Sequence, residues 1–364
     1  MKSFFIHLSL LLSSITILSA QTTLQGTVLD TKTKEPVAYA SVYLDGTTIG
    51  TATDLDGRFS LTVKNRIHTR LVVSFMGYES VVISNPYESI PEIIYLDEKD
   101  INLGEVIVWG KPTFTEKQKM EAFKDQFLGM TEAGYSCKIL NEDVIRLSYN
   151  PETNKLYGYA DVPIEIENKY LGYKIRFELI EFTLHLKRKK SLALIDTVSI
   201  IGLSFFEDLK KNEINYAERR EKIYKFSSRR FFKLLAERKI ELSDFRIYNY
   251  NVKAKVLTHP LQARNLFALK KNSSDSTTTI VLNSKKKDDF GIFNISVINV
   301  GKLSERVIRD TPYKTIASSK LHFFVDTFSV DKYGNTNLIK GIFINGIMGK
   351  QRVGDTMPTD YLPQ

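Results

Sequence analysis

The chain of 364 residues contains a single cysteine, Cys137, so it cannot form an internal disulfide. After its first 20 residues it also has no run approaching the roughly 18 consecutive apolar residues of a membrane-spanning helix. The stability of the mature chain must therefore come from buried apolar surface, and no helix of that kind is expected to anchor it in a membrane.

The short motifs that identify several common enzyme classes are absent too. The chain has no HExxH or HxxE pairing, no GxSxG, no GxxxxGK[ST] and no GxGxxG. Zinc peptidases, α/β serine hydrolases, P-loop enzymes and Rossmann enzymes therefore have no support. We expect no enzymatic activity, no catalytic or metal-binding residues and no cofactor. A carboxylate-dependent glycan hydrolase stays an alternative, and it would draw on Glu165, Glu167, Glu178 and Glu181.

The first 20 residues have the layout of a secretory signal peptide. Lys2 lies near the start, an apolar stretch runs from Leu8 to Leu18, and the small pair Ser19 and Ala20 precedes Gln21. We expect cleavage before residue 21 and export, with the periplasm favoured over outer-membrane association or surface display. A lipoprotein would have a cysteine in place of Gln21, so a soluble mature form is favoured.

Charge is distributed unevenly along the chain. The whole sequence carries a formal net charge of +9, yet acidic residues outnumber basic ones in residues 21–110 and basic residues dominate the rest. A basic surplus favours anionic partners such as lipid headgroups or acidic polysaccharide. Nucleic acid is not expected as a partner of an exported protein.

The sharpest basic cluster falls in a stretch with a helical pattern, between residues 206 and 240. Its arginines predict a surface for anionic lipid or glycan, and they are Arg219, Arg220, Arg229 and Arg230. The alternative is a solvated helix in which Glu218 pairs with Lys222, and Glu221 with Lys225, four residues apart.

The region before residue 110 reads as successive short strands. Seven segments rich in β-branched and aromatic residues are separated by turn residues, and they are TLQGTVLD, ASVYLDG, TIGTAT, RFSLTV, LVVSFMG, ESVVIS and EIIYLD. Seven strands in fewer than 100 residues indicate a β-sandwich. In TDLDGRFSL, Asp54, Asp56 and Gly57 predict a hairpin turn with a Gly bulge. Arg58 and Phe59 exclude a calcium loop, since they occupy ligand positions.

The segments GTVLDTKTKEPVAYASVYLDGTTIGTATDLDGRFSL, LVVSFMGYES and LGEVIVWG resemble the carboxypeptidase regulatory-like domain of Bacteroidetes envelope proteins, over residues 22–109. That family includes the front of TonB-dependent receptors. The resemblance implies a transthyretin-like β-sandwich, related to carbohydrate-binding-like folds, and no peptidase activity. Later stretches resemble the body of Bacteroidetes proteins that carry this domain, and this second resemblance implies no function. They are FKDQFLGMTEAGYSCKILNEDVIRLSYN, DVPIEIENKYLGYKIRFELIEF, SSRRFFKLLAER and the closing run from VDKYGNTN through MGKQRVGDTMPTDY.

The body opens with a predicted helix. Thr113 and Glu116 form a capping box at its start, and Gly129 ends it. Its apolar stripe consists of Met120, Phe123, Phe127 and Leu128.

Beyond this helix, KIRFELIEFTLHLK alternates with one residue too many, which predicts a β-bulge near Leu179 and Ile180. Ser228 is the expected cap of the helix FFKLLAER. Strands are expected around FRIYNYNVKAKV, STTTIVLNS, FGIFNISVINV, KLHFFVDTFSV and IKGIFINGI, with exposed loops at KKNSSDS and SKKKDD.

Together these patterns predict a mainly β protein in three segments: a signal peptide at 1–20, a β-sandwich at 21–110, and a larger antiparallel β domain with packed helices at 111–364. The expected function is that of a non-enzymatic envelope protein, a binding or scaffolding module for a carbohydrate or protein ligand. Its expected partner is an envelope protein or glycan, with an anionic membrane surface as a further partner. A small outer-membrane β-barrel related to TonB-dependent receptors is the other alternative.

Overall fold

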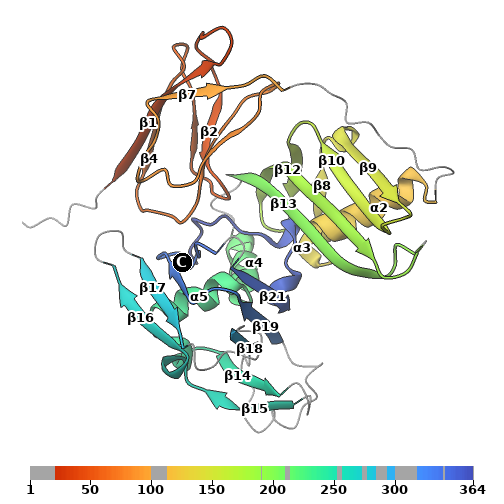
Figure 1. The fold of residues 1–364 in the computed structure, drawn as a ribbon, viewed down its shortest axis with the longest axis vertical. Coiled ribbons are helices and arrows are strands. Elements are labelled where there is room, and N and C mark those ends of the chain that lie inside the picture. Colours follow the sequence, from red (N-terminus) through yellow and green to blue (C-terminus); the bar gives the residue numbers. More distant parts are fainter. Residues whose placement is uncertain are drawn as a thin grey trace, which may run out of the picture.

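The computed structural model describes residues 21–99, 113–189, 191–209, 214–251, 256–272, 277–283, 293–299, 318–338 and 341–363. Within these ranges the strands form five sheets (Figure 1). Buried side chains gather in three large hydrophobic cores and one small cluster. The protein is thus mainly β with packed helices, as the sequence predicts. The predicted leader lies outside the described residues.

The first unit is a sandwich of two sheets. Its strands match the seven predicted segments, and they are β1 (Thr22–Asp30), β2 (Ser41–Leu44), β3 (Gly50–Ala52), β4 (Arg58–Val63), β5 (Leu71–Ser74), β6 (Val81–Ile83) and β7 (Ile93–Leu96). One sheet has the order β4-β1-β7 and the other β3-β2-β5-β6. Strand alternation builds the core, since Phe59, Leu61 and Val63 of β4 are buried while the residues between them are exposed.

The turn before β4 confirms one prediction and corrects another. Gly57 has a φ of +74°, and a Cβ atom there would lie 2.5 Å from the carbonyl oxygen of Val28, so glycine is required. The Asp54 carboxylate accepts hydrogen bonds from the N–H groups of Asp56 and Arg58. The predicted hairpin is wrong, because β4 pairs with β1 in one sheet and β3 pairs with β2 in the other.

The second unit is a six-stranded sheet covered on one face by a helix. Its elements are α2 (Glu116–Leu128), α3 (Glu132–Tyr135), β8 (Cys137–Ile139), η1 (Glu142–Val144), β9 (Ile145–Asn150), β10 (Lys155–Ala160), β11 (Ile164–Asn168), β12 (Tyr173–Leu186) and β13 (Ile195–Asp208). The strand order is β8-β11-β12-β10-β9, and β13 pairs with the other edge of β12. The long strand β12 therefore contacts β11 and then β10 on one side, and β13 along its length on the other.

The N-cap of helix α2 lies two residues after the predicted one, Thr113. Thr115 is the N-cap and forms a capping box with Gln118. Thr113 also precedes an acidic residue by three positions, so the two threonines carry equivalent signals in the sequence. The C-cap is Gly129, as predicted.

The third unit packs one helix against two sheets, and the helix before it contacts the second unit. Its elements are α4 (Ile214–Lys225), α5 (Ser228–Ala236), η2 (Ile240–Leu242), β14 (Phe245–Asn251), β15 (Val256–Leu261), η3 (Ala263–Asn265), β16 (Phe267–Lys271), β17 (Thr278–Leu282), β18 (Phe293–Asn299), β19 (Ser318–Phe323), β20 (Thr327–Val330) and β21 (Ile342–Gly346). The sheet orders are β15-β14-β18-β19-β21 and β16-β17-β20. Ser227, not the predicted Ser228, caps α5. In the described ranges, no helix has the length and apolar character to span a membrane.

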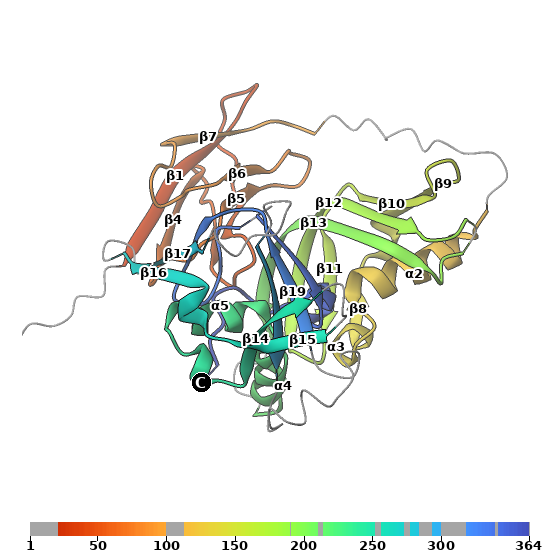
Figure 2. The same ribbon diagram turned by 60° about the horizontal axis from the view of Figure 1, so that its bottom comes forward.

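The C-terminal segment, which includes η6 (Met348–Lys350) and η7 (Val353–Asp355), joins the three cores. Met348 belongs to the core of the third unit and Val353 to that of the second. Leu362 packs against the core of the sandwich. In Figures 1 and 2 this segment, in blue, runs between the units. A segment of fewer than twenty residues therefore packs into or against all three cores.

The buried carboxylate of Asp331 links the sandwich to the third unit. Its Oδ2 accepts hydrogen bonds from the backbone N–H of His68 and the side-chain amide of Asn335, both at 2.9 Å. Its Oδ1 accepts from the N–H groups of Tyr333 and Asn335, at 2.8 and 2.9 Å. Asn335 also donates to the carbonyl oxygen of Thr359 at 3.0 Å. The carboxylate therefore joins three separate stretches of chain.

Candidate functional site

The six-stranded sheet has one apolar face and one largely polar face. On the apolar face, Phe123 and Phe127 of α2 pack against Phe182 of β12, with ring centroids 4.5 and 6.4 Å apart. These aromatic residues are buried, which confirms the predicted stripe of α2. The candidate site lies on the opposite face.

The predicted bulge in β12 allows the apolar side chains before and after it to face the same core. The register with β13 shifts between Leu179 and Glu181, so Ile180 is the additional residue, and it is 57% exposed. Phe177 and Leu179 before the bulge and Phe182 after it are all buried in the same core. Without the extra residue, one half of the strand would turn its apolar side chains to the opposite face.

The sandwich covers the half of the polar face that precedes the bulge. The backbone N–H of Gly46 donates to the carbonyl oxygen of Ser204 on β13, at 2.6 Å. The rings of Tyr43 and Phe205 lie beside each other, with centroids 5.2 Å apart. This docking leaves only the half beyond the bulge open.

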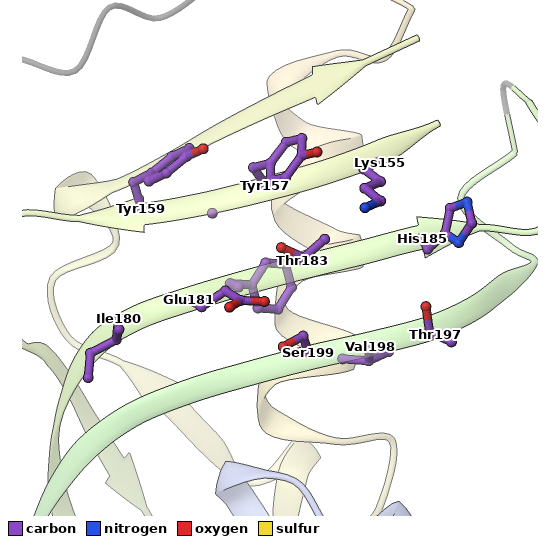
Figure 3. Close-up of a pocket in the computed structure, with 12 residues that line it drawn as sticks. Lys155, Tyr157, Tyr159, Ile180, Glu181, Thr183, His185, Thr197, Val198 and Ser199 are labelled. Atoms are coloured by element: carbon purple, nitrogen blue, oxygen red, sulfur yellow. The ribbon is translucent and has the colours of Figure 1, made fainter. Parts of the chain in front are cut away.

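The open half forms a hollow of about 520 Å³ (Figure 3). The register aligns its side chains in rows that cross β9, β10, β12 and β13. One row contains Asn150, Lys155, His185 and Thr197. The next contains Ser148, Tyr157, Thr183 and Ser199. The last pairs Arg146 with Tyr159 on one side and Glu181 with Ile201 on the other.

Two tyrosines on β10 provide the aromatic rings of this surface. Tyr157 and Tyr159 project to the same side of the sheet (Figure 3), and Tyr159 is 56% exposed. Partial burial, reinforced by the neighbouring Tyr157, raises the pKa of the Tyr159 hydroxyl, which therefore stays protonated and able to donate. Glu181 adds an acceptor and Lys155 adds donors. The surface combines aromatic rings with both kinds of hydrogen-bonding group.

The four arginines predicted to bind anions are occupied by internal partners. Arg220 is buried, and it binds both carboxylate oxygens of Asp208 at 2.9 Å. Its Nε donates to the carbonyl oxygen of Leu171 at 2.8 Å, and its guanidinium lies 3.9 Å from the ring centroid of Tyr173. Arg220 thereby fixes α4 to the end of the β12–β13 pair.

Arg229 binds the C-terminal segment. Its guanidinium donates to the carbonyl oxygens of Pro358 and Tyr361 and lies 5.3 Å from the ring centroid of Tyr224. Burial lowers the pKa of this arginine. Its hydrogen bonds are directed inward, towards backbone groups of the protein.

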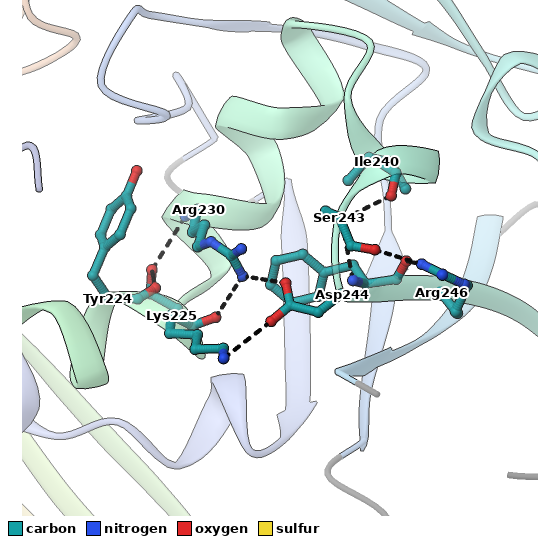
Figure 4. Close-up of polar contacts among 9 residues, drawn as sticks. Tyr224, Lys225, Arg230, Ile240, Ser243, Asp244 and Arg246 are labelled. Atoms are coloured by element: carbon teal, nitrogen blue, oxygen red, sulfur yellow. Dashed lines mark hydrogen bonds and ion pairs between the residues drawn. The ribbon is translucent and has the colours of Figure 1, made fainter. Parts of the chain in front are cut away.

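Arg230 and Arg219 also have partners within the protein. Arg230 and Lys225 both contact Asp244, at 2.7 and 3.5 Å (Figure 4). Burial opposes ionisation of Asp244, but the hydrogen bond and charge of Arg230 outweigh it and lower the pKa of this carboxyl. Arg219 lies over the ring of Tyr170, 5.0 Å from its centroid. The four arginines therefore do not form one exposed cationic surface.

The carboxylates considered for acid–base chemistry are separated by the fold. Glu165 and Glu167 on β11 pair with nearby lysines. Glu178 accepts a hydrogen bond from Ser80 of the sandwich at 2.7 Å, and of the four only Glu181 lines the hollow. Where the structure describes the chain, no group of three or more His, Cys, Asp or Glu side chains is arranged to hold a metal.

A serine–histidine contact lies at the junction between the sandwich and the third unit. Ser329 Oγ is 3.2 Å from Nε2 of His68. The adjacent Asp331 accepts a hydrogen bond from the backbone N–H of His68. Its two oxygens already accept four hydrogen bonds, so this trio lacks the arrangement of a catalytic triad.

Tyr157 and Tyr159 are not among the site residues predicted from the sequence, although a signal was present. In KLYGYA the two tyrosines are two residues apart and so share one face of a strand. Gly158 between them faces the core, where an added Cβ would lie 2.9 Å from the ring of Phe182. The glycine thus allows β10 to approach β12 closely while both rings face outward.

Comparison with known proteins identifies the sandwich only. Residues 24–108 match the family model of the CarboxypepD_reg-like domain. The chain is also 42% identical over 97 residues to the TonB-dependent receptor SusC of Bacteroides thetaiotaomicron. That alignment covers 27% of this chain and 9% of the receptor. These similarities are consistent with a Bacteroidetes envelope protein, and the open face of the sheet lies outside the family match.

Proposed function

We propose that this protein is an exported, non-enzymatic envelope protein that binds a carbohydrate chain on the open face of β10, β12 and β13. One observation carries the proposal: the rings of Tyr157 and Tyr159 are set among carboxylate, ammonium and hydroxyl groups in a hollow of about 520 Å³. The partial similarity to SusC supports an envelope location, and the periplasm is our proposed compartment.

The chemistry of a sugar suits these groups. A sugar ring has an apolar face of C–H groups, which packs on an aromatic ring such as that of Tyr159. Its hydroxyls donate to acceptors such as Glu181 and accept from donors such as Lys155. Thr183 and Ser199 lie in the same hollow and are able to do either. None of these contacts requires a charged ligand.

In this proposal the sandwich supports the binding surface. It docks on β13 through Gly46 and Ser204, and Lys99 donates to the carbonyl oxygen of Asp161, two residues beyond Tyr159. A sheet held on one side by α2 and on the other by the sandwich keeps its side chains in place before the ligand arrives. Such pre-organisation reduces the entropy lost on binding.

Affinity electrophoresis through gels that each contain one neutral or acidic polysaccharide tests the proposal. We expect at least one polysaccharide to retard the protein. The double variant Tyr157→Ala/Tyr159→Ala should lose affinity by about tenfold or more, a change of about 1.4 kcal/mol. Tyr135→Ala is the matched control, because its ring is 70% exposed on α3, and it should behave like the wild type.

Two results would contradict the proposal. One is a wild-type protein that no polysaccharide retards, and the other is a double variant that binds as well as the wild type. Reducing-end assays on the same polysaccharides test the non-enzymatic part. Release of sugar by the wild type but not by Glu181→Gln would replace the proposal with the glycan hydrolase alternative.

A further inference from the structure

β13 is the outermost strand of its sheet, and part of its outer edge has no partner in the described chain. Its inner edge pairs with β12 along its whole length. Near its C-terminal end the outer edge meets the sandwich, where Ser204 accepts from Gly46 and the N–H of Phe206 donates to Thr47. From residue 195 to 202, no described strand pairs with this outer edge.

The backbone groups on this free stretch are oriented for pairing. Peptide groups alternate in direction along a strand, so residues two apart present them to the same side. Ser204 and Phe206 point theirs outward, to the sandwich. Val198, Ile200 and Gly202 therefore also direct an N–H and a carbonyl outward. Such a row of free groups is a template for another strand.

Between residues 197 and 202 this edge has none of the usual protection against strand addition, and Asp196, where the register with β12 shifts, is the one charged residue of the free stretch. Residues 197–202 read TVSIIG, without proline, lysine or any other charged residue. Natural proteins commonly place such residues on free edges, or cover them, because bare edges associate. Ile201 is 45% exposed although it is apolar. The composition suits an edge that pairs with another strand.

We infer that this strand is β13 of a second copy, paired antiparallel around a two-fold axis at Ser199. Centring the pair there uses the whole free stretch, since Asp196 of one copy then faces Gly202 of the other. The strand pairing between the two copies ends where the sandwich already contacts the outer edge of β13. A two-fold pairing needs one self-complementary surface only, the commonest route to a dimer.

The charges beyond the paired stretch agree with this arrangement. Lys187, Arg188 and Lys189 lie in the turn that leads into β13. The register brings this turn of one copy towards Ser204 of the other. There Asp45 accepts from the Ser204 N–H and is already paired with Arg70, while Asp360 accepts hydrogen bonds from Thr48. Basic residues of each copy thus approach acidic residues of its mate, which favours this antiparallel alignment.

The pairing extends the candidate site. A two-fold axis perpendicular to the sheet leaves the open faces of both copies on the same side, so the two hollows form one continuous surface. Ser199, in the row with Thr183 and Tyr157, lies at the centre of this surface. A dimer would present twice the length of binding face to an extended ligand.

Cysteine crosslinking tests the axis directly. In the proposed pair, Ser199 faces its own symmetry mate as a non-hydrogen-bonded pair, with Cα atoms about 4.5 Å apart, a separation that a disulfide spans. Ser199→Cys should therefore form a disulfide-linked dimer on oxidation with copper phenanthroline. Thr183→Cys, on the same face but one strand inward, is the matched control and should form no disulfide-linked dimer. The native Cys137 can remain, because burial raises the pKa of its thiol to about 12.

Sedimentation velocity tests the strand pairing. The wild type should sediment as a dimer, and Ile200→Pro, which removes one outward N–H, should sediment as a folded monomer. Ile200→Val keeps that N–H and should remain dimeric. A wild-type monomer would overturn the inference and leave the edge to a strand from a different protein. A dimer without the Ser199→Cys crosslink would overturn it too, and neither result bears on carbohydrate binding.

Discussion

The basic helices α4 and α5 and the open face of the six-stranded sheet differ in what their polar groups are free to bind. In the helices, Arg220 and Arg229 direct their guanidinium groups to partners inside the protein. On the open face, Glu181 and Tyr159 project into a hollow. The helices have the greater charge in the sequence, yet the sheet offers more unoccupied chemistry. Charge counted along a chain therefore does not measure charge available to a ligand.

The two regions also differ in how much stability is lost when a polar side chain is removed. Removing a buried cation leaves its carboxylate partner without compensation, and the folded state bears that cost. Removing a side chain from an open face leaves nothing unsatisfied. The two regions should therefore respond in opposite ways to substitution, with stability lost in one and binding lost in the other.

The largest loss of stability is expected for Arg220→Met. This change keeps an unbranched, apolar stem but leaves the Asp208 carboxylate, only 14% exposed, without its partner. We expect the free energy of unfolding to fall by about 3–5 kcal/mol, measured by denaturant titration. Arg219→Met is the matched control and should cost about 1 kcal/mol or less, since that guanidinium mainly lies over a ring. Equal losses of unfolding free energy in the two variants would contradict the view that Arg220 is bound inside the protein.

A smaller loss is expected for Asp331→Asn. An amide offers one acceptor oxygen in place of two, so two of the four N–H donors around it lose their acceptor. We expect a cost of about 1–3 kcal/mol. Hydrogen exchange should show faster exchange at His68 and Asn335, where the sandwich meets the third unit. Unchanged exchange there would show that this carboxylate does not hold the junction.

The ion pair of Arg230 and Asp244 should appear as a dependence of stability on pH. The pKa of Asp244 is lower in the folded state, so its contribution is present above the unfolded pKa of about 3.9 and is lost as pH falls through the folded value. At pH 7, Asp244→Asn should cost about 1 kcal/mol. The difference from the wild type should disappear in acid, once the pH has fallen below the lowered folded-state pKa of Asp244. A difference that stays constant across this range would argue against the ion pair.

The smallest change in stability is expected on the open face. Tyr157→Ala and Thr183→Ala remove side chains that line the hollow without leaving a buried partner. Each should alter the free energy of unfolding by about 0.5 kcal/mol or less. Thermal melts measure this directly. A loss near that of Arg220→Met would mean that these side chains support the fold.

The sequence predicted local structure well wherever one segment carried its own signal. All seven strands of the sandwich, the stripe of α2 and the bulge at Ile180 follow from alternation within a few residues. Helix caps were less certain, because Thr113 and Thr115 carry equivalent signals, as do Ser227 and Ser228. The predicted loop SKKKDD, and part of KKNSSDS, lie outside the described residues.

Contacts between distant segments were beyond the reach of sequence patterns. The predicted pairing of Glu218 with Lys222 gives way to an ion pair of that lysine with Glu132 on α3. The partners of Arg229 lie 129 and 132 residues away, in the C-terminal segment. Which half of the sheet stays open depends on where the sandwich docks, and that contact joins residues far apart in the chain.

The most direct test of the central claim is the salt dependence of polysaccharide binding, measured by titration calorimetry from low to high salt. Binding through the tyrosines and through hydrogen bonds to an uncharged sugar should change little with ionic strength, and it should be lost in Tyr157→Ala/Tyr159→Ala. Binding through free arginines would weaken steeply with salt and survive in that double variant. The second result would contradict the account and return the site to α4 and α5.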